Sequence, residues 1–289
     1  MGTSQSSGGP GPGVPMVPSW TPPPPAEDLP AGPPPGDADQ VVPGDGQGEA
    51  PPDTTAAPRG PIPVAPSGRF LGARRSLTEF ARTGDGNEMR KSLGRYVRFG
   101  YGGARTATQR FGGTAATAGA LGGALAGIAS GQPVPPGSPL DPALLAGRSV
   151  NDVMDAVIEA VRPIDGTQDA EAERAAIRDS LSELLTRFPD ADLLNLDADQ
   201  RTFAIERFTA IDVFRRFELD LGKTIQEKAP NAAAALGRLK QVRDYVKEAV
   251  GAAFRKLRDA GRTLTAGRIG RVVTDALKET FEVFEGYAE

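Results

Sequence analysis

The chain has 289 residues, a formal net charge of −4, and neither histidine nor cysteine. The absence of histidine excludes the usual general base and every Ser-His-Asp or Cys-His arrangement. The absence of cysteine excludes disulfides, thiol nucleophiles and cysteine-ligated zinc or iron–sulfur clusters. We therefore expect a non-enzymatic protein with no cofactor, no catalytic residue and no metal ligand.

Residues 1–68 have the composition of a chain that does not fold by itself. They hold 19 of the 27 prolines, and they carry seven acidic residues against one basic residue, Arg59. Few apolar side chains are available to offset the entropy of ordering, so the sequence predicts a disordered or polyproline-like tail. A spacer role fits most of this tail, and recognition of its proline runs by a partner is the alternative.

The first twenty residues carry a more specific pattern than the rest of the tail. Gly2 is small enough for Met1 to be removed, which exposes the Gly2 amine, and the chain's only tryptophan, Trp20, closes the pattern. A tryptophan in such a tail indicates that a partner binds or processes this end. The pattern also matches N-myristoylation, but arginine usage far above lysine, with much alanine, glycine and proline, favours a bacterial source. No secretory signal pattern is visible, and we expect a cytoplasmic protein.

Residues 69–140 are predicted to be an interaction segment, basic at first, then rich in glycine and alanine, and partly helical. Residues 69–116 carry ten basic residues against three acidic ones, and aromatic side chains alternate with arginines. This pattern suits bases stacked on aromatic rings with phosphates on arginines, and it suits equally a helix bound to an acidic protein. The candidate contact residues are Arg95, Tyr96, Arg98, Tyr101, Arg105 and Arg110.

Residues 111–140 contain no charged side chain, and Gly119, Gly123 and Gly127 follow one another at four-residue spacing. In a membrane this spacing would indicate close helix packing. Few large apolar residues are present to drive insertion, however, so we expect a close-packed helix or a segment ordered on a partner.

Residues 141–289 show the periodicity of an all-α bundle of about five helices. Expected N-terminal capping residues are Ser149, Asp197 with Gln200, and Thr265. Val150 and Leu236 are assigned to inward-facing stripes. Carboxylates between Asp169 and Glu183, including Glu173, are assigned to an exposed face.

Two local patterns fail as binding motifs. Gly222-Lys223-Thr224 resembles the end of a phosphate-binding loop, but the first glycine of that loop would fall at Phe217. The acidic loop from Asp190 to Asp199 lacks the glycine and the final glutamate of a calcium loop.

The order of segments resembles the B-component family of bacterial Qat anti-phage systems. The resemblance is most specific over Gly2–Trp20 and over Ser92–Leu121, where the chain reads SLGRYVRFGYGGARTATQRFGGTAATAGAL, and it also includes RFLGARRSLTEFARTG from Arg69. The helical half resembles the family only in general pattern.

The resemblance implies a non-enzymatic adaptor in a four-protein operon. The implied partners are an ATPase (QatA), a QueC-like enzyme (QatC) and a TatD-like nuclease (QatD). A QueC-like enzyme activates a 7-deazaguanine carboxylate with ATP and joins it to an amine, and the implied acceptor is Gly2. Residues implied in recognition of the tail are Thr3, Ser4, Gly8, Gly9, Pro10, Pro18 and Trp20. Nucleic-acid binding through residues 69–116 is the alternative function.

Overall fold

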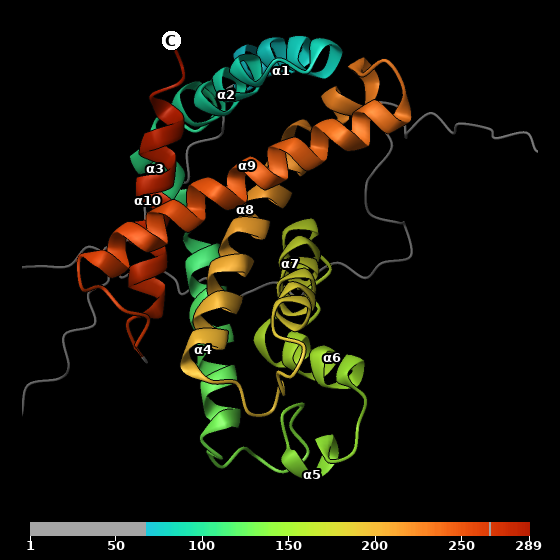
Figure 1. Ribbon diagram of the computed structural model, residues 1–289, viewed down its shortest axis with the longest axis vertical. Helices are drawn as coiled ribbons and strands as arrows, with labels where there is room; N and C mark the ends of the chain where they lie inside the picture. Colours follow the sequence, from blue (N-terminus) through green and yellow to red (C-terminus); the bar gives the residue numbers. More distant parts are fainter. Residues whose placement is uncertain (1–67, 266) are drawn as a thin grey trace, which may run out of the picture. The chain divides into compact units, whose positions relative to one another are not determined.

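The computed structural model describes residues 68–265 and 267–289. Over these residues the chain is all-α, with ten α-helices, one π-helix and no strand, which is more than the roughly five helices expected (Figure 1). The difference arises because residues 71–129 form four helices and the π-helix, and because a single turn at residues 142–145 adds another. The bounds are α1 Leu71–Thr83, α2 Gly86–Arg95, η1 Tyr96–Gly100, α3 Ala104–Arg110, α4 Gly112–Ala129, α5 Pro142–Leu145, α6 Val150–Val161, α7 Gln168–Arg187, α8 Ala198–Lys228, α9 Ala232–Asp259 and α10 Ile269–Glu285.

One hydrophobic core joins the interaction segment to the C-terminal helices. The longest helix, α8, packs against α7, α9, α4 and α1, and α10 packs against α4, α9 and α3. Buried side chains from α1 to α4 and from α6 to α10 belong to the same cluster. The helices of residues 71–129 therefore fold together with those that follow.

Side chains that accept hydrogen bonds from main-chain N–H groups mark the starts of α6 and α8. The Ser149 hydroxyl accepts from the Asp152 N–H at the start of α6, and the Asp197 carboxylate accepts from the Gln200 N–H at the start of α8. Both predicted caps are confirmed. The prediction for Thr265 is wrong, because α10 begins after Arg268 with no side-chain cap.

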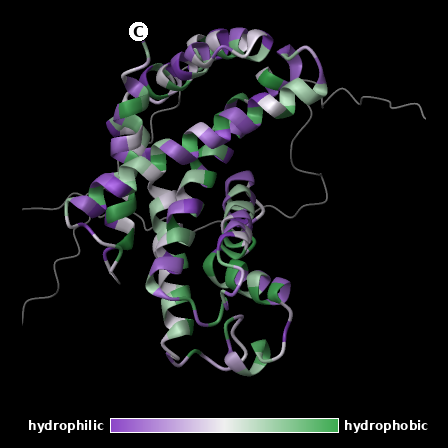
Figure 2. Ribbon diagram, viewed as in Figure 1, coloured by the Kyte–Doolittle hydropathy of each residue, from purple (hydrophilic) through white to green (hydrophobic). Residues whose placement is uncertain are grey.

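Most predicted inward-facing stripes are buried, and α9 alternates between hydrophilic and hydrophobic residues along its length (Figure 2). Leu236 is an exception, with 69% of its surface exposed, because the small Ala235 beside it takes the inward position. Val150 is also exposed, since it is the first residue of α6 and the buried face begins at Val153. The inward assignment of Leu236 and Val150 is therefore wrong.

The C-terminal end of the chain lies beside α2 (Figure 1). A β-carbon on Gly94 would lie 2.5 Å from the backbone nitrogen of Ala288 and 2.6 Å from the carbonyl carbon of Tyr287. Both are main-chain atoms, so neither can move aside as a flexible side chain would. Only glycine fits this contact between α2 and the end of the chain.

We predict that Gly94→Ala lowers the free energy of unfolding by about 2–3 kcal/mol, because the added methyl group forces the two backbones apart. Urea denaturation monitored by circular dichroism would measure the loss. The matched control is Gly86→Ala, where the methyl group meets no atom within 4 Å. The control is expected to be neutral or slightly stabilising, and an equal loss in both variants would contradict the prediction.

Candidate functional site

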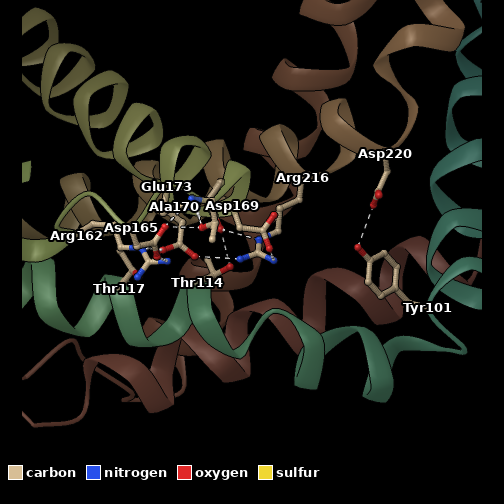
Figure 3. Close-up of polar contacts among 12 residues, drawn as sticks. Tyr101, Thr114, Thr117, Arg162, Asp165, Asp169, Ala170, Glu173, Arg216 and Asp220 are labelled. Atoms are coloured by element: carbon tan, nitrogen blue, oxygen red, sulfur yellow. Dashed lines mark hydrogen bonds and ion pairs between the residues drawn. The ribbon is translucent and has the colours of Figure 1, made fainter. Parts of the chain in front are cut away.

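Helices α4, α6, α7 and α8 direct polar side chains into one buried cluster (Figure 3). At its centre is Glu173 of α7, which is only 3% exposed. Its Oε1 lies 3.0 Å from Nη2 of Arg216, and its Oε2 lies 2.9 Å from Nε of Arg162. The Thr117 hydroxyl of α4 donates to the same Oε2 at 2.9 Å. One carboxylate therefore links four helical segments.

Asp212 of α8 is the second buried acid of the cluster and is fully enclosed. The Thr114 hydroxyl donates to its Oδ2 at 2.6 Å, and Nε of Arg216 lies 3.5 Å from the same oxygen. Burial raises the pKa of Asp212 to about 6, although Arg216 and the Thr114 hydroxyl act in the opposite direction. Its Oδ1 has no hydrogen-bond partner within the described residues.

The assignment of Glu173 to an exposed face is wrong. Glu173 lies four residues before Ile177 and eight before Leu181, so it falls on the buried stripe of α7. This spacing could have predicted that Glu173 is buried. The neighbouring charged residues of α7 led instead to the assignment of an exposed face. The i,i+4 spacing of Asp212 and Arg216 was visible in the sequence, but Thr114, which donates to Asp212, lies 98 residues away. Because Glu173 and Asp212 are buried, their contacts connect helices inside the protein.

We predict a distinctive pH dependence for the variant Asp212→Asn. An acid with a higher pKa in the folded state binds its proton more tightly there, so wild-type stability falls as the pH rises from about 4 to about 6. Asparagine does not titrate. The unfolding free energy of the variant, relative to wild type, should therefore increase by on the order of 2 kcal/mol between pH 4 and pH 7.

Urea denaturation at a series of pH values would measure this change. The matched control is Asp190→Asn at an exposed position, and the change with pH should be larger for Asp212→Asn than for this control. A change no larger than that of the control would show that burial does not perturb this carboxyl group.

Two residues of the predicted contact set, Tyr96 and Tyr101, point into the protein. Tyr96 is 2% exposed. Both hydroxyls donate to Oδ2 of Asp220 on α8, at 2.9 and 3.1 Å, and Arg69 lies 3.7 Å from the other oxygen. Burial raises the pKa of Tyr96 well above its usual value and that of Tyr101 to about 12, so both hydroxyls stay protonated and donate. These hydrogen bonds connect η1 and the residue after it to α8.

The four arginines of the contact set differ in their exposure to solvent. Arg95 is half-buried and donates to the Ser76 hydroxyl at 2.6 Å. Arg98, Arg105 and Arg110 are exposed, and the guanidinium of Arg98 lies 5.7 Å from the ring centre of Phe99. The structure therefore places three arginines at the surface, whereas Tyr96 is buried and Tyr101 is partly buried against the core. The tail residues, from Gly2 to Trp20, lie outside the described residues.

We predict that Asp220→Ala lowers the free energy of unfolding by about 2 kcal/mol, because two enclosed tyrosine hydroxyls lose their acceptor. Thermal or urea denaturation would measure the loss. Glu227→Ala on the same helix is the control, because Glu227 pairs with the exposed Lys223, at 3.6 Å. That change should stay within about 0.5 kcal/mol, and a similar effect of both substitutions would contradict the structural role of Asp220.

Other kinds of site were sought in the same part of the chain. Among the residues that the structure describes, no group of three or more histidine, cysteine, aspartate or glutamate side chains is placed to hold a metal ion. No single helix there is long and apolar enough to cross a membrane. Together α3 and α4 reach that length and composition, but they are bent by 50° at their junction.

Comparison with known proteins gives one match. The model of the family described as Qat anti-phage system associated protein QatB matches residues 102–284. No curated protein and no solved structure matches the chain. The matched range covers well over half of the chain and runs from the glycines after η1 almost to the end of α10. The chain therefore belongs to the QatB family and is a component of a Qat anti-phage system.

Proposed function

We propose that this protein is the non-enzymatic adaptor of its Qat system and works in the cytoplasm. In this proposal the helical domain binds the ATPase QatA, and the N-terminal tail presents the Gly2 amine to the QueC-like enzyme QatC. The nuclease QatD acts in the same assembly. The observation that carries the proposal is the family match over residues 102–284, because the other Qat components are the partners that membership implies.

The chemistry of the described residues supports an adaptor. Its strongest concentration of charge, around Glu173 and Arg216, is enclosed between helices and is used for packing. Tyr96 and Tyr101 are held as hydrogen-bond donors by Asp220. A group that is fully enclosed and already paired does not meet a substrate, so the reactive group of this protein is better sought in the tail.

The tail offers a simple reaction. A free α-amino group is a nucleophile once it is deprotonated, and its pKa near 8 leaves a useful fraction in that form at neutral pH. An ATP-activated deazaguanine carboxylate would be attacked by the Gly2 nitrogen. An amide bond forms, the activating group leaves, and the nitrogen loses a proton. The glycine has no side chain to obstruct the approach.

Nucleic-acid binding has less support. The exposed side chains of Arg98, Arg105 and Arg110 could contact phosphates, which gives affinity without reading sequence. The rings that would stack on bases, Tyr96 and Tyr101, are committed to the core and to Asp220. Of the aromatic rings in this segment, Phe99 stays exposed beside Arg98, so one ring–arginine pair of the pattern remains at the surface.

The test is the mass of the N-terminal peptide after co-expression of the protein with its neighbouring genes. We expect an added mass on Gly2 that disappears when the QatC gene is omitted. In the variant Gly2→Leu, Met1 is retained, so we expect neither the added mass nor protection against phage. The control Gly13→Leu keeps the Gly2 amine and should retain both. An unmodified Gly2 in the presence of all four proteins would refute the acceptor role.

A further inference from the structure

A cavity of about 680 Å³ lies within the described helices, outside the buried charge cluster. It is bounded by the middle of α4, the start of α8, the end of α9 and the start of α10. Its walls are mainly apolar, from Ile205, Phe254, Ile269 and Val272 together with small residues of α4. A cavity of this volume and composition has the dimensions of a site for a small molecule.

Two adjacent glycines of α4 explain why the space exists. A β-carbon on Gly122 would lie 2.4 Å from Cδ1 of Ile269 and 3.0 Å from Cδ1 of Ile205, so side chains already fill that position. At Gly123, which also lines the cavity, a β-carbon would meet no atom within 4 Å. Gly122 therefore serves helix packing, whereas Gly123 is exposed and lines the open side of the cavity.

The charged residues that line the cavity are mostly positive. Arg201, Arg258 and Arg262 line it, against a single acid, Asp199. Arg262 pairs with Asp275, and Arg201 donates to a backbone carbonyl, which leaves its positive charge without a carboxylate. Arg258 has Glu206 as an acidic neighbour, because its charge acts to lower the pKa of that carboxyl against the effect of burial.

We propose that this cavity is a binding site for a small ligand with a flat apolar body and one anionic group. The apolar body would lie over Gly123 against Phe254 and Val272, and the anionic group would meet Arg258 and Arg201. Guanidinium groups form strong, charge-assisted hydrogen bonds to carboxylate, sulfonate and phosphate oxygens, which fits one such group at this end of the cavity. The site is independent of the tail and of the reaction proposed for Gly2.

Anilinonaphthalene sulfonate has this chemistry and reports its own binding by fluorescence. We expect saturable binding of one molecule per chain, weakening as salt concentration rises. Gly123→Phe fills the cavity and should weaken binding at least about tenfold. The matched control is Gly237→Phe, at another helical glycine with open space around it, which should bind like wild type. Circular dichroism of both variants would establish that they are folded.

The charge requirement is tested separately. Arg258→Gln removes a charge at an exposed position and leaves the apolar walls intact. It should weaken binding of the sulfonate at least about threefold, while binding of the neutral phenylnaphthylamine, which has the same rings, should not change. Unaltered sulfonate binding in Gly123→Phe would refute the site. Equal binding of the neutral probe by wild type would refute its preference for an anion.

Discussion

Arg216 contacts three carboxylates, those of Asp169, Glu173 and Asp212, at 3.6, 3.0 and 3.5 Å. Its guanidinium also lies 5.2 Å from the ring centre of Phe111, at the start of α4. Asp169 is exposed, but Glu173 and Asp212 are buried, and removing Arg216 would leave these two carboxylates without full compensation, which is costly. Thr114 and Thr117 connect the same carboxylates to α4. These directional bonds fix how α4 is turned and placed against α7 and α8, which its small apolar residues alone would specify poorly.

The small residues of α4 have a different consequence on its other side. Gly270 of α10 approaches the carbonyl of Ala115 so closely that an added β-carbon would lie 3.3 Å from its oxygen. Ile269 fills the place beside Gly122, while the place beside Gly123 stays open. The same composition that permits close contact between α4 and α10 therefore also produces the cavity next to it. A helix with larger residues at these positions would lose both features.

The tyrosine-rich segment that distinguishes the sequence has a structural explanation. Tyr96 and Tyr101 donate to Asp220, and the main-chain N–H of Ala104 donates to Glu285 at 2.9 Å. The segment thus joins η1 to α8 and the start of α3 to the end of α10. Its distinctive pattern reflects these contacts between distant parts of the chain.

The sequence by itself determined the all-α class and the starts of α6 and α8. Ser149 and Asp197 cap helices through bonds to residues three positions away, and apolar stripes repeat with the helical period. Only the tertiary structure decided which polar residues are buried, because the threonines that donate to Glu173 and Asp212 come from α4, far away in the chain. The tertiary structure also shows that Tyr96 is buried and that Leu236 is exposed. A helical period places a residue on a face, but the neighbouring helices determine whether that face meets protein or water.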